Sequence, residues 1–239
     1  HHLMIHHLEN NMFPEDLSST ESYQRDNIFH WLHYVANYFL GYYRIPMHAY
    51  RKKRYSYLRY ILTWTSTYLG MTYVLFKVNP VFCLWAIMVP FFVAGFAMMM
   101  GNWCQHILVH PSVATMPQKL KSVPYNCALA IQCINNEGNM RNFNDGYHVT
   151  HHIESHCHWT EMPKRFYENV DSYANNEYCM TMIFKNMDVF QVGINIFLRN
   201  HKILYKNFVT LGKKKLPYDQ FVEEIKLRLK PIKRATSVA

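Results

Sequence analysis

The sequence predicts an all-α integral membrane protein in which a hairpin of two membrane-spanning helices joins a cytosolic helical cap that carries clusters of histidines. The first observation behind this fold class is that residues 78–118 contain no Asp, Glu, Lys or Arg. The second is that basic residues gather on either side of that stretch, and the third is that many of the 15 histidines stand in short clusters. A net charge of +9 also suits nucleic-acid binding. Nucleic-acid modules do not usually carry a charge-free run of bilayer length, so we expect basic flanks on a membrane protein and no nucleic-acid partner.

The chain opens on the histidine cluster HHLMIHH rather than on a methionine, which predicts a fragment truncated at its N-terminus. Residues 8–27 are polar and rich in turn formers, as in a soluble loop. Residues 28–50 are rich in aromatic side chains and are interrupted by Gly41, Arg44 and Pro46. This composition favours a helix lying in the membrane interface over one that crosses the bilayer.

Two apolar stretches predict the spans of the hairpin. Residues 60–76 carry no charge over 17 positions, at the short end for a span, and Arg59 and Lys77 can extend their charged ends to the interface. After a tight turn, the apolar run Val81–Met100 has 20 residues, about 30 Å as a helix, which matches the hydrocarbon core. We therefore expect spans over residues 60–76 and 81–101.

The distribution of Lys and Arg orients the hairpin. Five of them lie between residues 51 and 59, one lies in the turn, and many follow from residue 119 onwards. Since cytosolic loops carry an excess of Lys and Arg, both outer ends of the hairpin should be cytosolic, with all the histidine clusters on one side. We expect residues 1–163 to form the membrane domain. Residues 164–239 should form a cytosolic helical region, closed by an amphipathic helix with Phe221, Ile225 and Leu229 at four-residue spacing.

The segment HVTHH places His148, His151 and His152 at positions i, i+3 and i+4. On a helix these side chains share one face. Three neutral imidazoles without a carboxylate or thiolate suit a divalent transition metal such as iron, zinc or copper.

Two further segments complete the predicted metal site. His2 and His6 share a helix face while His7 points about a quarter-turn away, a divergence that suits two metals held close together better than one. Asn102 and His106 stand at i and i+4 just beyond the second span. We expect His106 to be a ligand and Asn102 to hold a water beside it.

Metal-bound imidazoles usually donate their other N–H to an acceptor, which fixes the tautomer. The acidic candidates close to the clusters are Glu9, Asp145, Glu154 and Glu161, and His156 is a further candidate. Each acidic residue could equally be a solvated surface charge.

These segments resemble the histidine boxes of the membrane fatty acid desaturase and hydroxylase superfamily. HLMIHH resembles the second box, HVTHH resembles the third, and NWCQH resembles the Asn-and-His element between them. The resemblance implies a centre of two iron ions at the cytosolic membrane face, where dioxygen is activated to attack a C–H bond of a lipid acyl chain. It also implies electrons from a donor such as cytochrome b5 or a ferredoxin, and an endoplasmic reticulum location.

Two departures from the family pattern stand out. The first histidine box is missing, which we attribute to truncation, so the fragment should not hold a complete site. The third box is extended by His156, His158 and Trp159, which departs from the pattern of the known desaturase subtypes.

Desaturation is the leading expectation, and hydroxylation is the runner-up because both reactions begin with the same C–H cleavage. A non-catalytic membrane metal-binding or transport protein would place polar residues along the spans. The spans here contain no charged residue and no histidine before His106. A structural zinc scaffold would have no need of Asn102.

Overall fold

The computed structural model describes residues 5–116, 122–174, 180–211 and 215–234. The chain divides into two compact units, one formed by residues 33–100 and the other by residues 2–32 together with residues 101–239. Most of the chain is helical, which confirms the main expectation of fold class.

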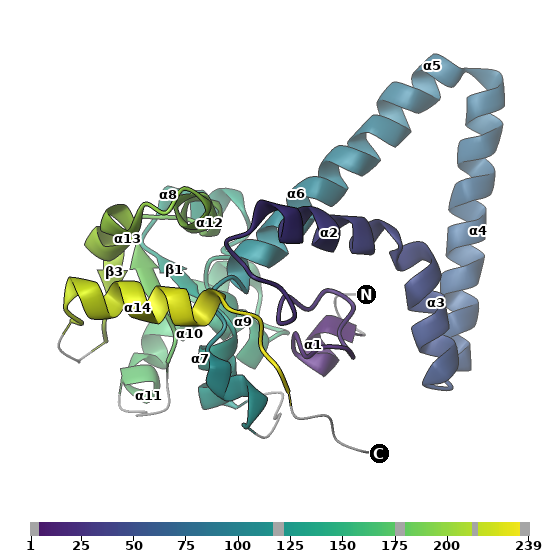
Figure 1. Cartoon of the computed structure of the whole chain (residues 1–239). Coiled ribbons are helices and arrows are strands. Elements are labelled where there is room, and N and C mark those ends of the chain that lie inside the picture. Colours follow the sequence, from purple (N-terminus) through teal and green to yellow (C-terminus); the bar gives the residue numbers. More distant parts are fainter. Residues whose placement is uncertain (1–4, 117–121, 175–179, 212–214, 235–239) are drawn as a thin grey trace. The chain divides into compact units, whose positions relative to one another are not determined.

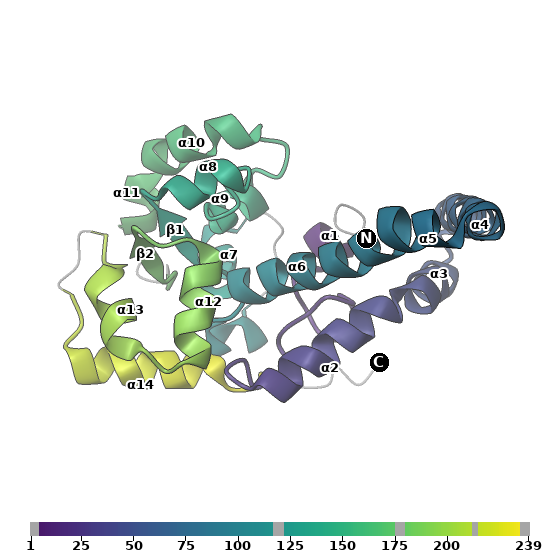
Figure 2. The ribbon, with the colours of Figure 1, turned by 90° about the horizontal axis from the view of Figure 1, so that it is seen from above.

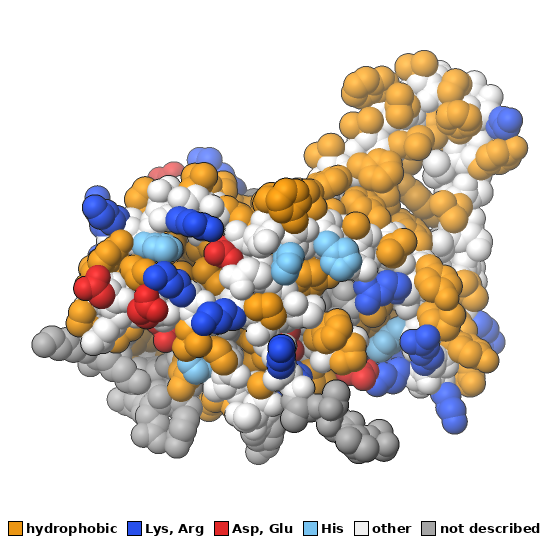
Figure 3. All heavy atoms as spheres, viewed as in Figure 1, with side chains coloured by type: hydrophobic (Ala, Val, Ile, Leu, Met, Phe, Trp, Pro, Cys, Tyr) orange, Lys and Arg blue, Asp and Glu red, His pale blue; other side chains and the backbone are white. Residues whose placement is uncertain are grey.

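The unit of residues 33–100 is a set of apolar helices. Its elements are most of α2 (Ile28–Phe39), α3 (Gly41–Arg51), α4 (Tyr55–Val78), α5 (Pro80–Cys83), the π-helical segment η2 (Leu84–Met88) and α6 (Val89–Gln105) up to Met100. Figure 1 shows α3 packed along α4, and α4 leading through a tight turn into α5. Hydrophobic side chains cover much of the visible face of these helices in Figure 3.

A single helix among the described residues is long and apolar enough to cross a membrane, judged by length and composition. It is the 26-residue run Pro80–Gln105, which contains the second expected span. The first expected span lies within α4, whose 24 residues include several Tyr, Thr and Ser side chains that lower its apolar character. The two helices of the expected hairpin are present. That α4, the first of them, spans the membrane stays a prediction.

The turn of this hairpin follows from two residues. The side chain of Asn79 accepts a hydrogen bond from Phe82 N at 3.0 Å and so caps α5, and Pro80 occupies the first turn, where it needs no backbone partner. The π-helical segment ends just before Pro90, where a changed hydrogen-bond register accommodates the missing N–H of proline.

The close approach of α2 to α6 depends on Gly95. A Cβ atom at this position would lie 2.9 Å from Cζ of Phe39. The Phe39 ring lies 5.4 Å from that of Phe92 and 5.7 Å from that of Phe96, between ring centroids. Phe39 therefore fills a notch that only glycine leaves open.

The second unit contains a small sheet of three strands, β1 (Gln132–Ile134), β2 (Ile183–Lys185) and β3 (Phe208–Val209). β1 and β2 are parallel and pair Gln132 with Ile183, whereas β2 and β3 are antiparallel. The all-α expectation did not include these strands. Strands of two or three residues are too short to show the alternation by which a sequence could reveal them.

Short helices surround this sheet. They are α1 (His7–Glu9), η3 (Pro111–Ala114), α7 (Val123–Leu129), α8 (Glu137–Arg141), α9 (His148–Ile153), η4 (Trp159–Glu161), α10 (Met162–Glu168), α11 (Val170–Ala174), α12 (Val189–Phe197), α13 (His201–Asn207) and α14 (Tyr218–Leu229). Figure 2 shows α12, α13 and α14 gathered at one end of the unit. The expected amphipathic closing helix is confirmed, since Phe221, Ile225 and Leu229 of α14 are buried.

Candidate metal centre

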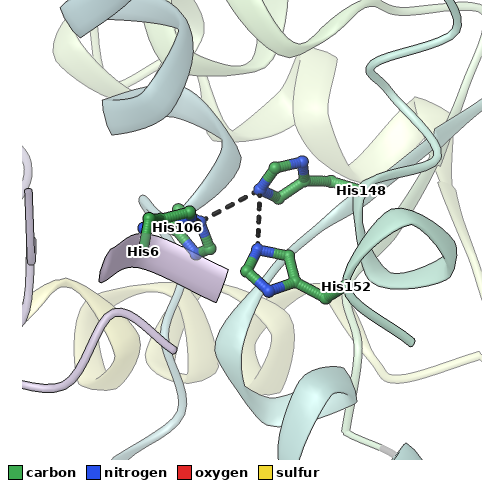
Figure 4. A group of neighbouring side chains, drawn as sticks. All are labelled: His6, His106, His148 and His152. Carbon is green, nitrogen blue, oxygen red and sulfur yellow. Dashed lines mark hydrogen bonds between the residues drawn. The ribbon is translucent and has the colours of Figure 1, made fainter. Parts of the chain in front are cut away.

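Four histidines from three separate segments converge in the second unit (Figure 4). His6 directly precedes α1, His106 directly follows α6, and His148 and His152 lie one turn apart on α9. All four are buried, with at most 4% of their surface exposed. One ring nitrogen of each lies within 4.8 Å of those of the other three.

The distances between these nitrogens fit a metal ion. The Nε2 atom of His106 lies 3.3 Å from that of His6 and 3.0 Å from that of His148. The Nε2 atoms of His148 and His152 are 3.1 Å apart. Imidazole nitrogens held about 2.0–2.1 Å from one ion stand roughly 3.0–3.4 Å apart at neighbouring positions. The spacing of the ring nitrogens therefore matches the spacing of imidazole nitrogens around a single metal ion.

Asp16 orients the first of these histidines. Its Oδ2 atom lies 2.6 Å from Nδ1 of His6 and accepts a hydrogen bond from Asn11 N at 3.1 Å. Its Oδ1 atom accepts hydrogen bonds from both the backbone N and Oγ of Ser18, each at 2.8 Å. Burial alone would raise the pKa of Asp16, but attraction to His6 and the hydrogen bonds from His6 and Ser18 lower it below its usual value. An ionised Asp16 favours the tautomer of His6 with its proton on Nδ1, so that the Nε2 lone pair faces His106.

Two more histidines of the cluster have a hydrogen-bond acceptor at Nδ1. Nδ1 of His152 lies 3.0 Å from Oδ1 of Asn10, and Nδ1 of His106 lies 3.2 Å from the carbonyl oxygen of Leu129. Both acceptors favour the tautomer whose Nε2 lone pair faces the centre. Nδ1 of His148 is buried and has no hydrogen-bond partner within the described residues.

Three histidines of the cluster, His106, His148 and His152, are neutral at physiological pH. Burial lowers the pKa of His106 to about 3, and burial with repulsion between neighbouring imidazoles lowers those of His148 and His152 well below the usual value. Only neutral imidazoles can donate a lone pair to a metal. These three histidines are therefore already in the protonation state that a metal requires.

His7 and His151 form a pair beside the group of four. Their ring centroids are 4.6 Å apart, and the centroid of His7 lies 5.2 Å from that of His152. Burial lowers the pKa of His151 to about 4. Of the predicted ligands, His2 lies outside the described residues.

The segments that carry these histidines match a known protein family. The family model described as fatty acid desaturase matches residues 1–183, a range that contains all six of these described histidines. The chain belongs to the fatty acid desaturase family. Neither the curated proteins nor the solved structures gave a match to the chain.

In this desaturase-family chain, Asn102 lies at the end of α6 next to the loop that carries Asp16. Its Nδ2 atom donates to the carbonyl oxygen of Ser18 at 3.2 Å, and Oγ of Ser18 lies 3.3 Å from Nδ1 of His6. Asn102 thus ties the helix that leads to His106 to the loop that orients His6. Its role in holding a water stays a prediction.

The other predicted supporting residues lie apart from the metal-facing nitrogens. No hydrogen bond among the described residues joins Glu9, Asp145, Glu154 or His156 to a histidine of the desaturase site. Glu154 lies 3.6 Å from Arg165 in a partly exposed ion pair, and His156 is exposed. Asp145 is exposed at the surface, where desolvation by neighbouring atoms still raises the pKa of its carboxyl.

Asp16 and Asn10 stand outside the residues that the sequence predicts for the site. Both belong to the polar stretch of residues 8–27, whose composition predicts a soluble loop, yet Asn10, Asn11, Asp16 and Ser18 are all buried. A carboxylate and an amide within ten positions of the first histidine cluster were the only available signal. Their burial depends on contacts with segments far along the chain, which composition does not reveal.

Proposed function

We propose that this chain is part of a membrane di-iron oxidoreductase that acts on lipid acyl chains, with dioxygen-dependent desaturation as its reaction. The observation that carries the proposal is the buried group of four converging histidines within the family match. When bound, a di-iron centre supplies the activation of dioxygen needed to cleave a C–H bond of the acyl chain.

We assign one iron to His6, His106, His148 and His152. The second iron is assigned to His7 and His151, together with His2. Support for this division comes from the different neighbours of His6 and His7: His6 faces His106, whereas His7 faces His151.

The side chains around the centre have three tasks in this proposal. The neutral imidazoles donate lone pairs, Asp16 and Asn10 hold the protons of His6 and His152 on the far ring nitrogens, and burial excludes water. Asn102 is proposed to hold a water close to His106.

The membrane arrangement proposed here has α4 and the run Pro80–Gln105 as a two-span hairpin, with residues 1–163 as the membrane domain and residues 164–239 as a cytosolic helical region. The histidines then lie on the cytosolic side, in the endoplasmic reticulum. An acyl chain that partitions into the bilayer can reach such a site without complete transfer into water. Cytochrome b5 or a ferredoxin is the proposed electron donor.

The test is a lipid analysis in cells that express the full-length protein or its His148→Ala variant. A histidine-dependent lipid lighter by two hydrogens is the expected product. A lipid heavier by one oxygen would make the enzyme a hydroxylase, and metal binding without any new lipid would favour a non-catalytic metal protein. His201→Ala is the matched control, because His201 lies at the start of α13 and outside the cluster.

A further inference from the structure

The C-terminal segment of residues 228–234 lies along the loop that follows the first histidine cluster. The backbone N of Arg25 donates to the carbonyl oxygen of Leu229 at 2.9 Å, and that of Ile232 donates to the carbonyl oxygen of Glu21 at 2.7 Å. This segment lies beyond residue 183, where the family match ends. The chain therefore uses residues outside the matched range to hold a loop within it.

A buried ion pair joins the same two segments. The Glu21 side chain is fully buried, and Arg234 contacts it through two parallel bonds, Nε to Oε2 at 2.9 Å and Nη2 to Oε1 at 2.6 Å. The guanidinium also donates to the carbonyl oxygen of Val113 and the hydroxyl of Tyr125, each at 3.0 Å. A two-pronged contact of this kind fixes orientation as well as charge.

Arg25 adds a second connection. It is fully buried, and its guanidinium donates to carbonyl oxygens of Thr20 at 3.0 Å and Ile107 at 3.0 Å. The same group donates to the carbonyl oxygens of Arg228 and Lys230 in the C-terminal segment. One side chain thus bonds the loop, the residue after His106 and the C-terminal segment.

The loop held in this way contains the carboxylate that orients His6. Oε2 of Glu21 accepts a hydrogen bond from Phe13 N at 3.2 Å, which closes the loop around Asp16. Next to Glu21, Oγ1 of Thr20 donates to the carbonyl oxygen of His106 at 2.9 Å. Movement of Glu21 would therefore displace the supports of two ligands.

We propose that Glu21 and Arg234 are positioning residues for the metal centre, through which the C-terminal segment fixes the loop that presents Asp16 to His6. This inference rests on the proposed function only in that the four histidines must bind a metal ion.

The experiment is a titration of the purified full-length protein with Co²⁺, followed by its visible absorption spectrum and by the rate of metal loss to a chelator. We expect Arg234→Ala to release Co²⁺ about tenfold faster or more, the size of effect typical for residues that support metal ligands, and to show a changed spectrum. Arg234→Lys keeps the positive charge but cannot form the two parallel hydrogen bonds to Glu21. Its rate of Co²⁺ release should therefore lie between the rates of the wild type and of Arg234→Ala. Arg165→Ala is the matched control, since Arg165 is half-exposed and forms its ion pairs with the partly exposed carboxylates of Glu154 and Glu168.

The outcomes separate the two proposals. Co²⁺ binding by the wild type, with Arg234→Ala matching Arg165→Ala in spectrum and release rate, would overturn the positioning role and leave the metal site intact. No Co²⁺ binding by the wild type would overturn both. If Arg234→Ala does not fold, Arg234→Lys decides, and a wild-type spectrum and release rate in that variant would refute the inference.

A second, independent observation concerns the turn between α3 and α4 in the other unit. The segment Arg51–Arg54 is entirely basic, Arg59 follows on the next turn, and residues 33–100 contain no Asp or Glu. Arg51, Lys52, Lys53 and Arg59 are exposed. Lys and Arg side chains surround this end of the unit in Figure 3.

Aromatic side chains flank the basic cluster. Tyr50, Tyr55 and Tyr60 are all more than half exposed. Exposed tyrosines beside an apolar helix are typical of the depth at which lipid headgroups lie. The cluster of Arg51–Arg54 and Arg59 therefore stands at the level of the phosphates once α4 and α5 lie in the bilayer.

The geometry points to this cluster as a docking surface for the headgroups of anionic phospholipids. Residues 33–100 contain seven Lys and Arg and no acidic residue, so the unit has a net positive charge that attracts a negatively charged leaflet, and the tyrosines beside the cluster hold it at the leaflet surface.

Lys53 allows a sharp test. Its φ of 55° lies in the left-handed region, where glycine is favoured over a residue with a side chain. Lys53→Gly removes one charge and relieves the backbone, so a loss of lipid binding cannot be ascribed to weaker folding. Lys77→Gln at the opposite end of α4 is the matched control.

The full-length protein in neutral detergent would be titrated with phosphatidylserine and with phosphatidylcholine, and bound lipid counted by native mass spectrometry. We expect a preference for phosphatidylserine that falls about fivefold in Lys53→Gly and is unchanged in Lys77→Gln. Equal binding of the two lipids, or an unchanged preference in Lys53→Gly, would refute the docking surface.

Discussion

His6 and His7 follow one another in the sequence, yet their rings face different neighbours. His6 points to His106 and to Asp16, whereas His7 lies against His151. The quarter-turn between adjacent helical residues produces this divergence. The spacing of the histidines predicted it, because it depends only on local backbone geometry.

The sequence alone could not predict which groups accept hydrogen bonds from the histidine rings. Asp16 reaches His6 across a loop, Asn10 meets His152 across 142 positions of the chain, and His106 uses a backbone carbonyl. Because every residue has a backbone carbonyl, the sequence does not indicate which one accepts such a hydrogen bond. Proximity along the chain favoured Glu9 and Glu154, whose positions depend on how the loops fold.

Asp16→Asn should lower metal affinity about 10- to 100-fold, because an amide cannot supply the charge that holds the proton of His6 on Nδ1. Equilibrium titration of the metal-free protein with Zn²⁺ against a competing chelator measures the effect. Glu9→Gln is the control, since no hydrogen bond among the described residues joins Glu9 to a ligand. A larger effect of Glu9→Gln than of Asp16→Asn would reverse the roles assigned to these two residues.

The metal-free protein should lose stability as the pH falls below about 6.5. Burial lowers the pKa of His106 to about 3 and that of His151 to about 4 in the folded chain. Between those values and the ordinary pKa of about 6.5, the unfolded chain binds more protons, so the free energy of unfolding decreases as pH falls. Each such group contributes a slope of up to about 1.4 kcal/mol per pH unit in that window. Chemical unfolding over a pH series measures it, and constant stability between about pH 7 and pH 5 contradicts the burial of neutral histidines.

Secondary-structure elements differed in how well the sequence predicted them. The long helices could be read from composition, since a charge-free run of bilayer length has few alternatives. The three strands could not, because β1, β2 and β3 owe their pairing to segments about 50 and 25 residues apart rather than to a local pattern.

Gly95→Ala should destabilise the helical unit by about 1–3 kcal/mol, because the new methyl group meets the Phe39 ring at 2.9 Å. Thermal unfolding in detergent measures the change, and Phe39→Leu in the same chain should recover part of it. Gly70→Ala on α4 is the matched control, as no atom lies within 4 Å of its added Cβ. That variant should be neutral or slightly more stable, since alanine favours the helix. Equal effects at the two glycines would mean that Phe39 does not fill the notch.

Charge is divided unequally over the whole chain. All 16 acidic residues lie outside residues 33–100, which contain seven Lys and Arg residues. A segment that enters a bilayer gains nothing from carboxylates, whereas a water-facing unit uses them to pair its cations, as Glu21 does with Arg234. The charge pattern that predicted the spans therefore also predicts which unit contains the buried polar network of the metal centre.

The region beyond the family match contributes packing as well as hydrogen bonds to that centre. A Cβ atom at Gly193 of α12 would collide with Sγ of Cys104, two residues before His106. Gly193→Ala should therefore push α12 away from the end of α6, lower stability by about 1–3 kcal/mol and weaken metal retention together. Cys104→Ala in the same chain removes the colliding sulfur and should restore both properties, as measured by thermal unfolding and by Co²⁺ release. Restored stability without restored metal retention would show that α12 supports the fold without supporting the site.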